Sequence, residues 1–194
     1  FWNIHPSMLP LYRGASPTAY PLLLGKESSG CSLMKMDADM DHGPIIAQDT
    51  YPISRIDTQH SLLEKLAILG YSLFKTHVVE LAEGRLHGVN LAVQNDSLAT
   101  FTRMLTRDDA FIELSVIKKA LNKERLTTDE LPLIMRQFIS QNTVQEYPIP
   151  YAPYIVYNMH RALYLWPGVW TLVQHQGSAK RLKLLDLELD KDTL

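Results

Sequence analysis

The chain has 194 residues, 46% of them hydrophobic and 21% charged, with a formal net charge of −2, which is the composition of a globular protein. The charge excludes a broad basic field for nucleic acids, and no apolar run reaches the roughly 18 residues of a membrane span, so no membrane partner is expected. One cysteine, Cys31, excludes an internal disulfide and fits a reducing compartment, so we expect a cytoplasmic protein.

The first predicted strand contains Asn3, Ile4 and His5. Because side chains alternate along a strand, Asn3 and His5 share one face and Ile4 points to the other. Pro6 cannot continue a hydrogen-bonded ladder, so the strand ends there. Two hydrogen-bonding side chains therefore lie together at the carboxyl end of a strand, where open α/β sheets bind ligands. Asn-x-His is a weak signal by itself, and a purely structural histidine is the plainer alternative.

Four more elements are predicted up to Gly84, and with the first strand they indicate an α/β layered domain. They are a short helix over 17–24, strands over 31–36 and 44–51, and a long helix over 58–83. The long helix has its leucines at helical spacing, a capping-box pattern at Ser61 and Glu64, and Gly84 after its last turn. The short helix has Ser16 as a candidate N-cap and Gly25 at its end.

The loop over 37–43 is a second candidate site because it follows a predicted strand and contains Asp37, Asp39, Asp41 and His42. Three carboxylates can ligate a hard cation, but the spacing of an EF-hand loop is absent. A solvated turn is the simpler interpretation of these residues taken alone.

The composition of the sequence changes after residue 93. We therefore expect a first domain over 1–93, a linker over 94–102 and a second domain over 103–194. Residues 94–102 are mostly polar. In the second domain, helices are predicted over 108–120 and 127–139, with Thr106 and Thr127 as caps, followed by an irregular connector over 141–154. A helix over 155–165 and strands over 169–174 and 180–189, around a turn at Gly177 and Ser178, complete the prediction.

The stretch NIHPSMLPLYRGASP, followed by MKMDADMDHGPIIAQ, resembles the folate-dependent formyltransferases. That family transfers the formyl group of 10-formyltetrahydrofolate to an amine. Two motifs in the family's order are more specific than either alone. The residues at the signature positions are Asn3, His5, Ser7, Leu9, Pro10, Asp41 and Gly43. The resemblance implies a partial Rossmann-like α/β domain with 10-formyltetrahydrofolate as co-substrate.

The resemblance also implies roles for individual residues. Asn3 would donate to the oxyanion of the tetrahedral intermediate, and His5, as an imidazolium, would donate more strongly. Asp41 would orient His5, favour its charged form and relay the amine proton. No metal is required. The loop that would line the pterin pocket contains Asp37, Ala38, Asp39, Met40 and Asp41, and the residues implied on the substrate side are Ser7, Leu9, Pro10 and Arg13.

Later segments resemble the branch of this family that formylates methionyl-tRNA. YRGASP over 12–17, ATFT over 99–102 and WPGVW over 166–170 are similar to that branch's active-site loop, linker and approach to a small C-terminal barrel. This implies methionyl-tRNA as a partner, a monomer, and an incomplete OB-like β-barrel that contacts the tRNA. Met8, Leu11 and Leu165 depart from the branch's pattern, and the insert over 122–150 is longer than expected.

Three alternatives remain open. Another amine formyltransferase, or a deformylase that uses water, would share Asn3, His5 and Asp41. A truncated, non-catalytic module that binds RNA or another protein would fit a chain that opens with Phe1 inside a strand. We expect such a fragment, lacking the first strands of the catalytic domain, rather than a chain counted from its first ordered residue. A metal hydrolase built on His5, Asp41 and His42 is the most remote reading.

Overall fold

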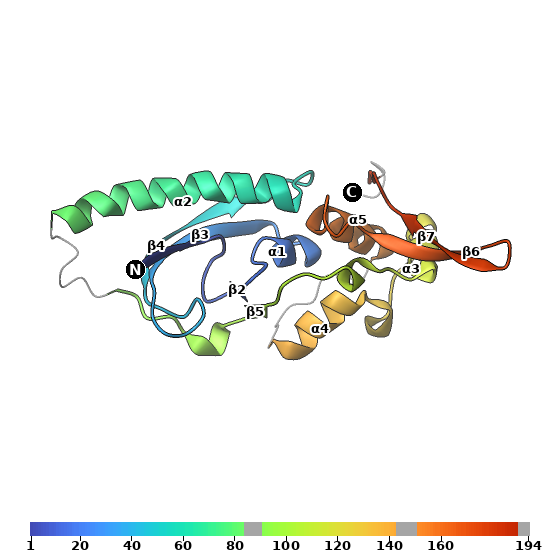
Figure 1. Ribbon diagram of the computed structural model, residues 1–194, viewed down its shortest axis with the longest axis horizontal. Coiled ribbons are helices and arrows are strands. Elements are labelled where there is room, and N and C mark those ends of the chain that lie inside the picture. Colours follow the sequence, from blue (N-terminus) through green and yellow to red (C-terminus); the bar gives the residue numbers. More distant parts are fainter. Residues whose placement is uncertain (84–90, 143–150, 190–194) are drawn as a thin grey trace. The chain divides into compact units, whose positions relative to one another are not determined.

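The computed structural model describes residues 1–83, 91–142 and 151–189, and the chain divides into two compact units (Figure 1). The first unit comprises 1–21 and 26–104, and the second comprises 22–25 and 105–194. The short helix α1 (Ala19–Leu23) spans the division near its end. Among the described residues, no helix combines the length and hydrophobicity that a bilayer span requires.

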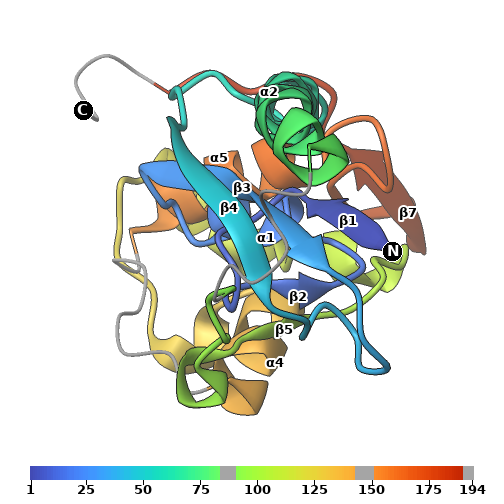
Figure 2. The same cartoon turned by 90° about the vertical axis from the view of Figure 1, so that its left-hand side faces the viewer.

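An antiparallel sheet and one long helix form the core of the first unit. Strands β1 (Trp2–His5), β3 (Ser28–Lys35) and β4 (Ile45–Pro52) lie in the order β1-β3-β4. Helix α2 (Gln59–Ala82) covers one face of this sheet (Figure 2). The predicted α/β layering, the three strands and the long helix are thereby confirmed.

The alternation predicted for the first strand is present in β1. Gly70 marks a close approach of α2 to the sheet, because a Cβ atom on it would collide with Ile4 and with the Cys31 Sγ atom. Ile4 therefore faces the helix. In the β1–β3 register Asn3 lies opposite Met34 and His5 opposite Ser32, so these residues share the other face. The polar pair is thus on the face that α2 does not cover.

The start of α2 differs from the predicted capping box. Thr58 is the capping residue, since its Oγ1 atom accepts from the Ser61 amide at 3.3 Å and its own amide donates to Ser61 Oγ at 3.0 Å. The box predicted at Ser61 and Glu64 is wrong because Ser61 already lies in the first helical turn. The predicted terminal residue, Gly84, lies outside the described residues.

The buried face of α2 gives a stability prediction. Leu66 is fully buried, whereas Leu63 is 44% exposed. We expect Leu66→Ala to lower the free energy of unfolding by about 2–5 kcal/mol, because it removes buried methyl groups and leaves a cavity. Leu63→Ala is the matched control and should cost about 0.5 kcal/mol or less. Urea unfolding followed by circular dichroism measures both, and equal costs would contradict the buried face assigned to α2.

The segment predicted as a linker is bonded into the first unit. Strand β5 (Phe101–Thr102) pairs in parallel with β2 (Arg13–Gly14), and a 3-10 turn, η1 (Asp96–Leu98), precedes it. The Tyr12 amide donates to Thr100 Oγ1 at 2.8 Å, and the Ser16 amide donates to Thr102 Oγ1 at 3.1 Å. The polar side chains that make this stretch look like a linker instead satisfy the main chain of the loop after β1.

The second unit contains helices α3 (Leu114–Leu121), α4 (Leu133–Gln141) and α5 (Ala152–Ala162) and a hairpin of β6 (Trp170–His175) and β7 (Ser178–Lys183). The first two helices begin later than predicted, after the 3-10 turns η2 (Asp108–Ala110) and η3 (Thr128–Glu130). Pro132 separates η3 from α4, as expected of a residue that lacks an amide donor. The hairpin turns at Gln176 and Gly177, both with positive φ, one residue before the predicted turn.

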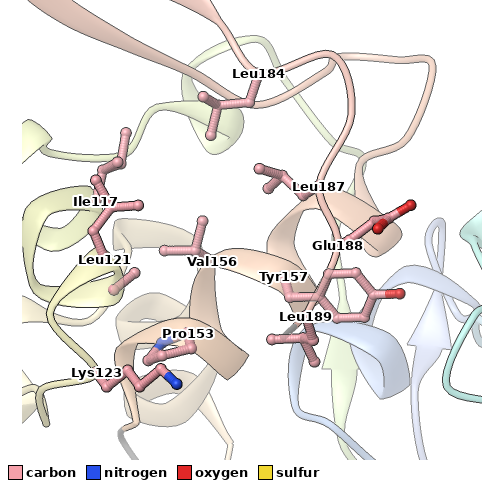
Figure 3. A pocket seen from close by; sticks show the side chains of 11 residues that line it. Ile117, Leu121, Lys123, Pro153, Val156, Tyr157, Leu184, Leu187, Glu188 and Leu189 are labelled. Carbon is pink, nitrogen blue, oxygen red and sulfur yellow. The ribbon is translucent and has the colours of Figure 1, made fainter. Parts of the chain in front are cut away.

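The expected OB-like barrel is not shown. Within the described residues of the second unit, the regular strands form one two-stranded hairpin and no closed barrel is present. Strand β7 ends at Lys183, so the predicted strand over 180–189 is only partly formed. Residues 184–189 instead border a cavity of about 270 Å³ with α3 and α5, lined by apolar side chains such as Ile117, Val156 and Leu187 (Figure 3).

Candidate active site

The three predicted catalytic side chains meet on the sheet face opposite α2. The Asn3 Nδ2 atom lies 3.4 Å from Asp41 Oδ1, and the His5 Nδ1 atom lies 3.6 Å from Asp41 Oδ2. The His5 side chain is 5% exposed and the Asp41 side chain 16% exposed. An amide, an imidazole and a carboxylate are therefore brought into one partly shielded cluster.

The route by which Asp41 reaches this cluster differs from the prediction. We expected both motifs at a common carboxyl edge of the sheet. Because β1 and β3 are antiparallel, Trp2 pairs with Lys35, and the loop after β3 starts beside the first residue of β1. The loop then folds along the sheet face to place Asp41 beside Asn3 and His5.

The Asp41 residue is held from several directions. Its φ is 52°, in the left-handed region that aspartate tolerates better than most residues. The Gly14 amide donates to Asp41 Oδ2 at 2.8 Å, and the Gln94 side chain donates to the Asp41 carbonyl at 2.9 Å. Gly14 has φ of 106°, and a Cβ atom on it would overlap the Thr102 carbonyl. A glycine is therefore required at the position that holds the carboxylate.

The hydrogen bonds of His5 define its tautomer. Its Nε2 atom lies 3.1 Å from the Tyr12 carbonyl, which can only accept, so Nε2 carries the hydrogen and Nδ1 faces Asp41. Burial lowers the pKa of His5 below its ordinary value of 6.5, and the Asp41 charge and the Tyr12 carbonyl offset this only in part. This direction favours the neutral imidazole, whereas the resemblance implied an imidazolium.

The rest of the aspartate loop faces solvent. Residues 37–40 are exposed, and His42 closes the loop through its Nδ1 atom, 2.6 Å from Asp37 Oδ2. The His42 Nε2 atom lies 3.4 Å from Asp96 Oδ2. His42 is therefore turned toward two carboxylates other than Asp41. Across the ranges that the structure describes, no three His, Cys, Asp or Glu side chains converge in a way that could hold a metal ion.

The two histidines should titrate on opposite sides of pH 6.5. The hydrogen bond to Asp37 is the main cause that raises the pKa of His42, whereas burial lowers the pKa of His5. By linkage, His42 stabilises the fold below pH 6.5 and loses that effect as pH rises through its folded pKa, while the contribution of His5 falls as pH drops below 6.5. NMR titration of the ring ¹³Cε1 signals, assigned with His5→Gln and His42→Gln, measures both. Midpoints in the reverse order would contradict these environments.

The residues predicted on the substrate side have structural partners. Ser7 is fully buried and its Oγ atom donates to the Leu11 carbonyl at 2.6 Å. Leu9 packs in a small apolar cluster, and the Pro10 carbonyl accepts from the Thr100 amide. Arg13 is 3% exposed, and its guanidinium donates to Gln94 Oε1 and Asp96 Oδ1, each at 2.8 Å. These contacts show how the loop is held, and a substrate contact of these four residues stays a prediction.

Two residues that hold Asp41 were missed from the sequence. Gln94 was placed in a linker, and Gly14 was noted only as part of a motif. A glycine beside a predicted site loop is the one available signal, since a close approach of main chain is a common reason for that residue. Nothing in the polar stretch around Gln94 distinguishes it from a solvated residue.

Comparisons with known proteins show which families and structures this chain is similar to. The family described as formyl transferase matches residues 1–78. The chain is 39% identical over 125 residues to a methionyl-tRNA formyltransferase of Roseiflexus sp. and 40% identical over 124 residues to one of Pseudomonas fluorescens SBW25. Each match covers 64% of this chain and 37% or 38% of the relative. The chain therefore spans well under half the length of the curated relatives that it matches.

Solved structures share the fold. A 4-N formyltransferase from Francisella tularensis aligns with a TM-score of 0.62 at 16% identity, over 97% of this chain and 63% of that one. An N-formyltransferase from Helicobacter canadensis, in complex with folinic acid and dTDP-3-aminofucose, aligns with a TM-score of 0.61 at 18% identity, over 92% of this chain and 52% of that one. The residues that meet around Asp41 thus lie in a segment that matches the formyl transferase family and is similar to methionyl-tRNA formyltransferases.

Proposed function

We propose that this chain carries the catalytic side chains for transfer of a formyl group from 10-formyltetrahydrofolate to the amino group of methionyl-tRNA. The observation that carries the proposal is the convergence of Asn3, His5 and Asp41 in the matched segment. Formyl transfer to an amine needs a donor for the developing oxyanion and an acceptor for the amine proton. The cluster contains both.

Each side chain has a part in the proposed reaction. The amine nitrogen attacks the formyl carbon, and the Asn3 amide, whose Nδ2 atom has two hydrogens, offers one to the oxyanion while the other is directed at Asp41. The His5 Nδ1 atom has the free lone pair of the tautomer present, so it accepts the proton of the attacking amine. Asp41 stabilises the imidazolium that then forms. The bond from the formyl carbon to the folate nitrogen then breaks, and that nitrogen takes the proton from the His5 imidazolium, which returns to its neutral form.

The exposed loop over 37–40 is the proposed contact for the pterin ring. Residues 37–40 are exposed and lie next to Asp41 in the sequence, so we propose that their main-chain groups pair with a planar ring placed beside the cluster. The Met40 side chain is 59% exposed and can cover an apolar ring surface.

We further propose that the second unit contacts the tRNA as an incomplete OB-like barrel, and that the protein is a cytoplasmic monomer.

The choice of methionyl-tRNA over a sugar amine rests on sequence identity. The relatives at about 40% identity are methionyl-tRNA formyltransferases, whereas the sugar formyltransferases are similar in fold at under 20% identity. A test needs both acceptors, because Asn3, His5 and Asp41 alone do not distinguish them.

The proposed function is tested with a chimera of the Pseudomonas fluorescens SBW25 enzyme that carries residues 1–104 of this chain in place of its own equivalent segment. We expect formyl transfer from 10-formyltetrahydrofolate to methionyl-tRNA and none to dTDP-3-aminofucose. The 194-residue chain is assayed beside it under the same conditions. A folded chimera without transfer to methionyl-tRNA would contradict the proposal.

A further inference from the structure

We infer that Gln94, held by Arg13, is a positioning residue that fixes Asp41 against His5. We call Arg13 and Gln94 together the clamp. This inference rests on the proposed function, because it assigns the clamp a part in formyl transfer. The Gln94 side chain is buried, at 7% exposure, within a stretch that is otherwise largely exposed. It connects strand β2 with the loop after β3.

Both ends of the Gln94 amide are used. Its Oε1 atom accepts from Arg13 Nε at 3.1 Å and from Arg13 Nη2 at 2.8 Å. Its Nε2 atom donates to the carbonyls of Asp41 at 2.9 Å and Gly43 at 2.8 Å. The guanidinium can only donate and the two carbonyls can only accept, so one orientation of the amide satisfies every group.

The main chain at Asp41 needs such a restraint. Asp41 is a non-glycine residue with a positive φ of 52°, a conformation that the surrounding contacts must stabilise. Gln94 bonds the carbonyls of Asp41 and Gly43 and so fixes the main chain on both sides of His42. Gly14, the neighbour of Arg13, holds the Asp41 carboxylate at the same time.

Arg13 is itself fixed, which makes the clamp rigid. Its guanidinium bonds Asp96 as well as Gln94, and its main chain forms β2 beside β5. The Arg13 contact lowers the pKa of Asp96, in agreement with an ion pair. Gln94 therefore bonds the Asp41 carbonyl and the Gly14 amide bonds its carboxylate. The carboxylate is thereby held 3.6 Å from His5 Nδ1.

The test replaces Gln94 with methionine, which has a similar volume and neither the amide donors nor the amide acceptor. The matched control is Ser97→Ala, which removes a hydrogen bond to Asn95 in the same exposed turn but none to the aspartate loop. Gln94→Glu is the second variant, because it can still accept from Arg13 but no longer donates to the two carbonyls.

Two readouts are compared, the rate of formyl transfer and the pKa of His5, and the unfolding midpoint of each variant is measured alongside. In the chimera, Gln94→Met and Gln94→Glu should lower the single-turnover rate of formyl transfer about 10- to 100-fold with less than threefold change in KM, whereas Ser97→Ala stays within twofold. In the 194-residue chain, NMR titration should show the pKa of His5 lower in Gln94→Met than in the parent, because Asp41 recedes from Nδ1.

The outcomes separate the two proposals. A rate within twofold of the parent for Gln94→Met, or a lower unfolding midpoint with an unchanged His5 pKa, would overturn the positioning role and leave formyl transfer standing. A shifted His5 pKa in a chain whose parent chimera transfers no formyl group would support the clamp and overturn the proposed function. Full activity of Gln94→Glu would also overturn the clamp, since it would show that the two carbonyl bonds are dispensable.

Discussion

Replacing Asp41 with asparagine is expected to lower the single-turnover rate of formyl transfer at least 10²- to 10³-fold. The carboxylate faces His5 Nδ1 and accepts from the Gly14 amide and from Asn3. An asparagine keeps the shape and tolerates the left-handed main chain, but it removes the charge that stabilises the imidazolium. The measurement is rapid-quench transfer in the chimera at saturating 10-formyltetrahydrofolate and methionyl-tRNA.

Asp49→Asn is the matched control for this change. Asp49 lies on the exposed part of β4 and its carboxylate accepts from the neighbouring Thr50 amide. It should leave the rate within twofold of the parent. If Asp41→Asn is as active as Asp49→Asn, the carboxylate has no part in the reaction.

The effects of Asp41 and His5 should not add. Both side chains are proposed to act on the same proton, so His5→Ala combined with Asp41→Asn should be little slower than the slower single variant. A double variant whose loss equals the product of the two single losses would mean that the two residues act on different steps.

Asn3→Ala has the second largest expected effect, a loss of about 10²- to 10³-fold in the single-turnover rate, the scale found for one oxyanion donor. KM for both substrates should change by less than about threefold, because the amide is proposed to bind charge that develops in the transition state. The variant also removes a hydrogen bond to Asp41. NMR titration of His5 distinguishes the two roles: an unchanged His5 pKa assigns the loss to the missing oxyanion donor.

Local patterns predicted the parts of the fold that depend on neighbouring residues. The period-two alternation of Asn3, Ile4 and His5 holds because Ile4 faces α2 at Gly70. The spacing of the leucines predicted α2, although among its leucines whose burial the structure describes only Leu62 and Leu66 are fully buried. The positions of Asn3, His5 and Asp41 in two motifs predicted that they would meet, as they do.

What the sequence missed depends on tertiary context. The antiparallel register of β1 and β3 decides how Asp41 approaches His5, and no residue pattern encodes it. The lowered pKa of His5 follows from burial, which the motif does not reveal. Gln94 was placed in a linker because its neighbours are polar. The structure shows that its amide is bonded to Arg13, which is far away along the chain, so the local sequence could not reveal this contact. In the second unit, Pro132 divides what was predicted as one helix.

Single-turnover formyl transfer by Asn3→Ala and His5→Ala, each in the chimera at saturating 10-formyltetrahydrofolate and methionyl-tRNA, tests the catalytic cluster most directly. Both side chains project from the face of β1 that does not contact α2, so neither takes part in packing against the helix. Transfer should fall at least about a hundredfold in each variant, with the unfolding midpoint measured alongside to show that the fold is retained. Rates near that of the parent in both variants would contradict the account and leave Asn3 and His5 as ordinary residues at the end of a strand.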